Sequence, residues 1–174
     1  VWDDLTPDKI LSAKAFDNAI KVHMAMGGST NAIIHVVAMA RRAGIPLDMK
    51  RFDELARVVP VVANVRPSGK HLMEDFYYAG GLRALMAEMK HLLDLDCMTV
   101  SGKTIGANID GAKVHLPDVI HPLSNPISAA GATAVLTGNI APGGCVMKPS
   151  AAPKKFLKHR GKVIPVKGRM VMLR

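Results

Sequence analysis

Ser29, Thr30 and Asn31 are the side chains in this sequence whose types and spacing best suit binding of a small anion. They directly follow the pair Gly27–Gly28, and an apolar run begins at Ala32. Glycines allow positive φ and close approach of another group, whereas Ser, Thr and Asn are preferred helix N-cap residues. We therefore predict a helix N-terminus whose free N–H groups suit a carboxylate or a phosphate. A plain capped helix after a glycine turn explains the same residues, and local chemistry alone favours that interpretation.

A second candidate binding segment is the loop 66–70, with the sequence Arg-Pro-Ser-Gly-Lys. It follows residues 61–65, a short β-branched apolar run that we interpret as a buried strand. Ligands of α/β folds bind at loops directly after buried strands, so Ser68 and Lys70 are weaker candidates for the same site. An ordinary connection between a strand and a helix explains this loop equally well.

Other polar side chains are better explained by structure than by chemistry. His23 and His35 have no second ligand four residues further on, so we interpret both as satisfied interior or boundary histidines. Glu74 and Asp75 point in different directions on a helix, and acids are favoured in a first helical turn. Residues 101–104 resemble the end of a phosphate-binding loop, but the upstream glycine is missing, which excludes that motif.

The cysteines and the apolar runs bound the cellular setting. Cys97 and Cys145 have neither a C-x-x-C partner nor metal-ligand spacing, so a reduced, cytoplasmic compartment is the simpler expectation. The longest apolar run, residues 32–40, is too short to span a bilayer, and we expect no membrane partner. With 49% hydrophobic residues, the chain can bury a core.

The charge is unevenly distributed, with a net value of +9 and nine Lys or Arg without any acid in residues 148–174. This stretch lacks interleaved aromatic residues and a nucleic-acid motif, so nucleic acid is not an expected partner. A non-catalytic basic binding module nevertheless stands as an alternative function, because a basic surface attracts acidic partners. Steeply salt-dependent binding would support that alternative.

Periodicity and capping residues place these candidates on predicted elements. We expect a helical turn after Thr6 and further helices over about 13–26, 30–42, 49–59, 71–79, 82–93 and 105–109. We expect strands at 61–65, 97–100, 119–120, 134–136, 146–147 and 163–164. The fold class is therefore α/β. Residues 1–110 would be the C-terminal part of a helix-rich α/β domain, and residues 111–174 the start of a smaller, β-barrel-like domain.

Seven short motifs occur in an order that resembles the dihydroxy-acid dehydratase and phosphogluconate dehydratase family. The resemblance extends from about Thr6 to about Gly161, and several details resemble the sugar-acid dehydratase branch. The motifs are 27–32 (GGSTNA), 66–70 (RPSGK), 73–75 (MED), 79–81 (AGG), 99–104 (TVSGKT), 122–126 (PLSNP) and 138–142 (GNIAP).

The resemblance implies a hydro-lyase that removes water from a 2,3-dihydroxy carboxylate and yields a 2-keto acid. It also implies an iron–sulfur cluster acting as Lewis acid, a Mg²⁺ ion that holds the substrate, and a homo-oligomeric full-length enzyme. In such an enzyme we expect Ser29, Thr30 and Asn31 to form a wall of the site. The substrate would be a small dihydroxy acid, either a branched-chain dihydroxy acid or a sugar acid.

The chain also departs from the family pattern. Family members are about three times longer, and the cluster and Mg²⁺ ligands lie outside the part that matches. Gly131-Ala132-Thr133 stands where the family usually has a glycine pair followed by Leu. We therefore expect an internal fragment that needs the remainder of its parent chain, binds neither cofactor alone and is inactive alone. A remnant without activity is a third possibility.

Overall fold

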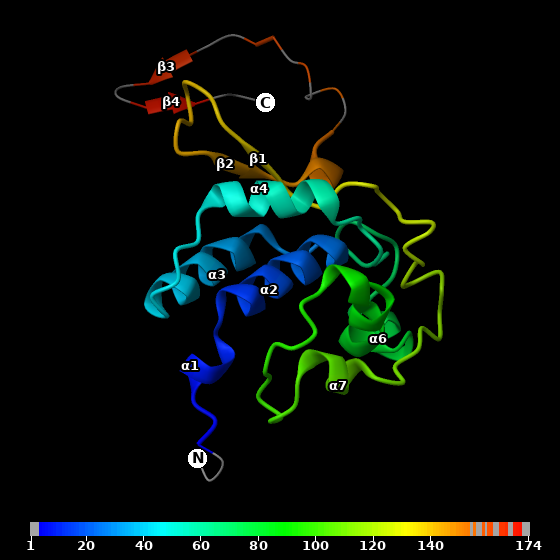
Figure 1. The fold of residues 1–174 in the computed structure, drawn as a ribbon. Helices are drawn as coiled ribbons and strands as arrows, with labels where there is room; N and C mark the ends of the chain where they lie inside the picture. The colour runs from blue at the N-terminus through cyan, green and yellow to red at the C-terminus, as the bar shows by residue number, and fades with distance from the viewer. Residues whose placement is uncertain are drawn as a thin grey trace.

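The structure is a computed structural model that describes residues 4–153, 155, 158, 160–161, 164–166 and 169–171. Short helices dominate the first 110 residues, and short strands follow (Figure 1). The α-helices are α1 (Pro7–Ile10), α2 (Ala13–Met26), α3 (Thr30–Arg42), α4 (Met49–Val58), α5 (Met73–Tyr78), α6 (Gly81–Glu88) and α7 (Ile105–Ile109). The 3₁₀ turns are η1 (Lys90–Leu92) and η2 (Pro149–Ala151), and the strands are β1 (Ala134–Leu136), β2 (Cys145–Met147), β3 (Ile164–Val166) and β4 (Arg169–Val171).

Side-chain caps fix where four of the helices begin. The side-chain oxygens of Ser12, Ser29, Asp48 and Thr104 each accept a hydrogen bond from a backbone N–H in the first turn of α2, α3, α4 and α7. Such a cap satisfies a donor that has no partner within the helix. The predicted starts of these helices are thereby confirmed.

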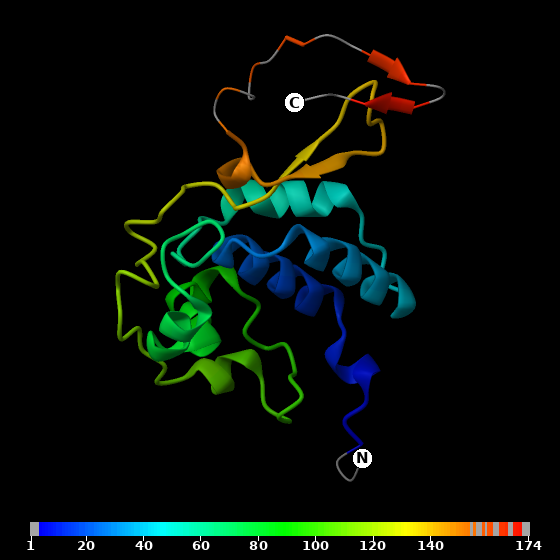
Figure 2. The same cartoon turned by 180° about the vertical axis from the view of Figure 1, so that it is seen from behind.

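The core lies between α2, α4 and α6, with the extended residues 61–65 running through it. Figures 1 and 2 show α4 lying across α2 and α3, with the β1–β2 hairpin on the far side of α4. Phe52 of α4, Met24 of α2 and Leu85 of α6 are almost completely buried. All three belong to one buried cluster, and burying a side chain of this size stabilises the fold by roughly 1.5–3 kcal/mol.

Residues 61–65 are buried and extended, but they are not a strand, so that prediction was wrong. Val61 forms an isolated bridge with Ser128, and Ala63 forms another with Ile120. The backbone N–H groups of Val62 and Ala63 both donate to the carbonyl of Ala25, at the end of α2. Because the bridges of Val61 and Ala63 go to different segments, residues 61–65 form no continuous ladder.

Two further strand predictions were wrong for a similar reason. Only Met98 of residues 97–100 pairs, with Thr104, because the chain reverses at Gly102, whose φ is +72°. Residues 119–120 end a turn in which both N–H groups donate to the carbonyl of Leu116. The predicted helix 82–93 is shorter than expected, since α6 ends at Glu88 and η1 follows.

The strands pair as two separate antiparallel hairpins. Ala134 of β1 is opposite Met147 of β2, and Ile164 of β3 is opposite Val171 of β4. The strands predicted at 134–136 and 146–147 are confirmed, whereas Val163 of the predicted strand 163–164 lies outside the described residues. The described chain is thus a mixture of helices and small sheets, consistent with an α/β class. None of its helices is long and apolar enough to cross a membrane.

Candidate functional site

The Gly27–Asn31 turn joins the end of α2 to the start of α3, as the sequence predicted. Gly27 adopts the left-handed conformation with φ +67°, which a residue with a side chain adopts only with strain. The hydroxyl of Ser29 accepts a hydrogen bond from the N–H of Asn31 at 3.2 Å. Ser29 and Asn31 are exposed and Thr30 is half-buried, so these side chains lie where a ligand could reach them.

Thr30 and Asn31 also line a cavity of about 430 Å³. The apolar part of its wall comes from α3, from the start of α4 and from β2. These apolar residues are Ile33, Ile34, Val37, Met49 and Val146. Binding sites for small molecules are commonly apolar hollows with a few fixed polar groups, and this cavity has that composition.

Of the two candidates in the loop 66–70, one joins the turn and the other does not. A Cβ added to Gly27 would lie 3.5 Å from Oγ of Ser68, so Ser68 packs directly against the turn. Lys70 is exposed, and its backbone N–H donates to Oδ1 of Asn64 at 3.1 Å. The geometry therefore groups Ser68, but not the side chain of Lys70, with the Gly27–Asn31 turn.

Lys148 and Ser150, which the site prediction did not include, complete this cluster. The ammonium of Lys148 donates to the carbonyl oxygens of Gly27 at 2.6 Å and Gly28 at 3.3 Å. Ser150 donates from its hydroxyl to Oγ of Ser68 at 3.2 Å. Nothing in the local sequence connects residues 148–150 with a turn 120 residues away.

His23 contacts the same turn, and its environment differs from the prediction. It is half-buried, but its Nε2 atom is buried without a hydrogen-bond partner among the described residues, so a satisfied histidine was the wrong expectation. Burial, and then the positive charge of Lys148, lower the pKa of His23 below its usual value. Both effects favour the neutral form of the imidazole. Burial also lowers the pKa of the Lys148 ammonium.

Of the remaining predictions for single side chains, the one for His35 was wrong and the one for Asp75 is confirmed. His35 is exposed on α3, so the interior or boundary position predicted for it was wrong. Asp75 accepts a hydrogen bond from the N–H of Leu72 at 2.7 Å at the start of α5, which confirms its role as an acid of the first turn. The described residues include no group of three or more His, Cys, Asp or Glu side chains that could hold a metal ion.

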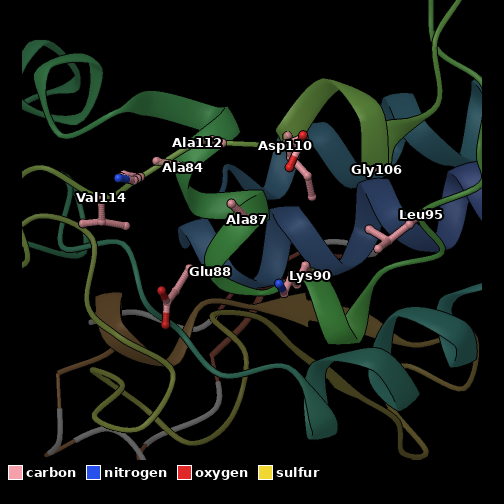
Figure 3. A pocket seen from close by; sticks show the side chains of 12 residues that line it. Ala84, Ala87, Glu88, Lys90, Leu95, Gly106, Asp110, Ala112 and Val114 are labelled. Carbon is pink, nitrogen blue, oxygen red and sulfur yellow. The ribbon is translucent and has the colours of Figure 1, made fainter.

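A separate cavity of about 580 Å³ lies between α6 and α7 and contains none of the predicted site residues. Figure 3 shows Glu88 at the end of α6, Lys90 in the turn that follows, and Asp110 beyond α7. Glu88 already accepts a hydrogen bond from the N–H of Leu123 at 2.9 Å. This cavity combines charges of both signs with small side chains, and we assign it no chemistry.

Comparison with known proteins identifies two family models along this chain. The model described as dihydroxy-acid/6-phosphogluconate dehydratase N-terminal matches residues 1–108, and the corresponding C-terminal model matches residues 118–172. Each model covers one of the two parts into which the motifs fall.

Curated relatives agree with these models. A Rhizobium meliloti protein named as a dehydratase is 48% identical over 161 residues, which are 92% of this chain and 28% of the relative. A dihydroxy-acid dehydratase of Caldicellulosiruptor bescii is 46% identical, over 92% of this chain and 30% of its own length. An L-arabinonate dehydratase of Rhizobium leguminosarum bv. trifolii is 44% identical, over 94% of this chain and 29% of its own length. The chain therefore spans about three-tenths of the length of these relatives.

Proposed function

The chain belongs to the dihydroxy-acid/6-phosphogluconate dehydratase family, and on this premise we propose that it is part of a hydro-lyase. The enzyme would dehydrate a 2,3-dihydroxy carboxylate, either a branched-chain dihydroxy acid or a sugar acid, to a 2-keto acid. The observation that carries this proposal is the match of both family models in order along the chain. Relatives named as dihydroxy-acid dehydratase and as L-arabinonate dehydratase support both substrate classes.

Within that enzyme, the Gly27–Asn31 turn would form one wall of the substrate site. The exposed N-terminus of α3 carries N–H groups and a partial positive charge, both of which favour a carboxylate. The hydroxyl of Thr30 and the amide of Asn31 would orient the substrate above the apolar cavity that they line. Ser68 packs against the same turn and is a further candidate, and Lys70 is the weakest.

An iron–sulfur cluster and Mg²⁺ are implied by the family, but the described residues of this chain do not fit either group. They offer no cluster of three metal-ligating side chains. Burial raises the pKa of the Cys97 thiol, whereas cluster ligands are thiolates. We therefore assign the ligands of both cofactors to residues outside this chain and expect neither to bind the chain alone.

The parent protein would complete what this chain begins. The hairpins β1–β2 and β3–β4 would be the first strands of a smaller, barrel-like domain, closed by strands from the remainder of the parent chain. We place the junction between the two domains at residues 100–115. The same proposal includes homo-oligomeric assembly of the parent enzyme and a cytoplasmic location. A chain that lacks the cofactor ligands would be inactive by itself.

Thr30→Ala in the intact protein tests the proposed wall. Loss of a hydrogen bond to a charged substrate costs about 1.5–3 kcal/mol, so kcat/KM should fall roughly 10- to 100-fold. Thr137→Ala is the matched control, because Thr137 is exposed and its side chain forms no hydrogen bond with the described residues. Unchanged kcat and KM for Thr30→Ala would remove Thr30 from the site. Absence of turnover in the unmodified protein with dihydroxy acids of both classes would remove the proposed activity.

A further inference from the structure

Lys148 makes a contact between two segments that are far apart in the sequence. Its ammonium is partly buried and donates hydrogen bonds to two carbonyls, those of Gly27 and Gly28, which are 121 and 120 residues earlier. Moving an ammonium out of water is unfavourable unless its protons find acceptors. Hydrogen bonds from a charged donor are roughly twice as strong as neutral ones, so these two bonds hold the turn firmly against residue 148.

The two carbonyls are suited to a cation because of where they lie. They end the 14-residue helix α2, whose C-terminus carries a partial negative charge. The same turn begins α3, whose cap is Ser29. A cation bound here therefore fixes the end of one helix and the start of the next at a single point.

A neighbouring hydrogen bond connects a third segment to this point. The hydroxyl of Ser150, two residues after Lys148, donates to Oγ of Ser68 in the loop 66–70. Ser68 in turn packs against Gly27. The segment 148–150 thus fixes the relative positions of the turn and of the loop, which together carry all five sequence-predicted site residues.

We propose that Lys148 is a positioning residue, which holds the Gly27–Gly28 turn so that Ser29, Thr30 and Asn31 present the N-terminus of α3 to the substrate. This inference rests on the proposed dehydratase function. Lys148 itself takes no part in bond making, because its ammonium donates to the backbone carbonyls of Gly27 and Gly28. Its effect on turnover is transmitted by the turn.

His23 offers an internal reporter of this contact. A Cβ added to Gly28 would lie only 2.6 Å from Cε1 of His23, so the imidazole packs directly on the turn. The charge of Lys148 contributes to the lowered pKa of His23. When the ammonium is removed, the pKa of His23 should move back toward its ordinary value.

The test compares Lys148→Met, Lys148→Arg and the control Lys103→Met in the intact protein. Lys103 is exposed, and its side chain forms no hydrogen bond or ion pair with the described residues. Hydrogen–deuterium exchange of residues 27–32 should be about tenfold faster in Lys148→Met than in the unmodified protein or in Lys103→Met. With a 2,3-dihydroxy acid, kcat should fall about tenfold with a smaller change in KM, and Lys148→Arg should recover most of that loss. NMR titration should show a raised pKa of His23 in Lys148→Met.

Three results would overturn the inference. Unchanged exchange over residues 27–32 in a folded Lys148→Met protein would show that the lysine does not hold the turn. Faster exchange with unchanged kcat and KM would reduce its role to stability. Failure of Lys148→Arg to restore kcat while exchange is slow again would show that fixing the turn does not govern turnover. Should Lys148→Met not fold, Lys148→Gln, which keeps one donor, takes its place with the same criteria.

The experiment also separates this inference from the proposed activity. If the unmodified protein turns over no dihydroxy acid, the dehydratase function fails, and the catalytic part of the positioning role fails with it. The exchange rates and the His23 titration still report whether the lysine holds the turn. If turnover is normal and the Lys148 variants match the control in every measurement, the activity stands and the positioning role is refuted.

Discussion

Replacing Gly69 by Ala should strongly destabilise the protein, because the added methyl group has no space. A Cβ at this position would lie 2.5 Å from the backbone N of Val65 and 2.6 Å from Oδ1 of Asn64, and closer still to the carbonyl carbon of Asn64. Two of these atoms belong to the backbone, which cannot rotate away as a flexible side chain can. The chain at Gly69 is therefore packed against residues 64–65 with no gap.

Asn64 cannot move aside without losing hydrogen bonds of its own. Its side chain donates to the carbonyl of Asp118 and accepts from the N–H of Lys70, both at 3.1 Å. Its backbone N–H donates to the carbonyl of Val119 at 2.8 Å. Overpacking of this kind costs about 1–3 kcal/mol, and one broken hydrogen bond adds about 1 kcal/mol. We expect Gly69→Ala to lower the free energy of unfolding by about 2–4 kcal/mol.

Urea denaturation of the intact protein, followed by circular dichroism, measures this loss. Gly138→Ala is the control, because a Cβ at Gly138 meets nothing within 4 Å. Its free energy of unfolding should stay within about 0.5 kcal/mol of the unmodified value. A Gly69→Ala protein as stable as the Gly138→Ala protein would refute the close approach on which the estimate depends.

Three further predictions concern buried polar groups. The side chain of Asn18 is buried, and it donates to the backbone carbonyl of Asp94 and accepts from its N–H, both at 2.9 Å. Asn18→Ala should therefore lower the free energy of unfolding by about 2–3 kcal/mol in the same denaturation experiment. A loss below about 0.5 kcal/mol would contradict this pair of hydrogen bonds. The hydroxyl of Thr133 is buried without a partner among the described residues, so Thr133→Val should raise the free energy of unfolding by about 1 kcal/mol, and a loss of stability would show that the hydroxyl is satisfied. Because the pKa of His23 is lowered in the folded state, the unfolded state binds the extra proton first and stability falls as the pH drops below about 6.5. The slope of unfolding free energy against pH between about 7 and 5 should be smaller in His23→Gln, and an equal slope would exclude this contribution.

Local sequence signals were sufficient for the helices that carry the site. The capping side chains of Ser12, Ser29, Asp48 and Thr104 act within three residues of their own position, so the sequence alone located the starts of four helices. Gly27 was identified as the end of α2 on the same basis, because glycine readily adopts the left-handed conformation found there.

Contacts between distant segments account for what the sequence did not reveal. Residues 61–65 have the composition of a strand, but whether they form one depends on partners such as Ile120 and Ser128, which no local pattern specifies. Lys148 belongs to the basic stretch 148–174, and its ammonium turns inward to the carbonyls of Gly27 and Gly28. Sequence reasoning could note the residue type but not the direction of the side chain.

The predicted site residues also differ in whether local sequence or distant packing brings them together. Ser29, Thr30 and Asn31 lie together because they are consecutive, and Ser68 joins them through the packing of the loop 66–70 on Gly27. The role of all four as a substrate wall stays a prediction, as does that of Lys70.

The scattered pairing of residues 61–65 has a consequence for how the chain is made. Val61 and Asn64 bond to Ser128 and Val119, so the central segment can be closed only after about 60 later residues have been synthesised. At roughly 5–20 residues per second, a ribosome exposes this valine-rich segment for several seconds before its partners emerge. Loop closure over such separations is slow as well, and unpaired apolar β-branched segments associate readily. We therefore expect residues 61–65 of the nascent chain to stay exposed until residues 119–128 have been synthesised.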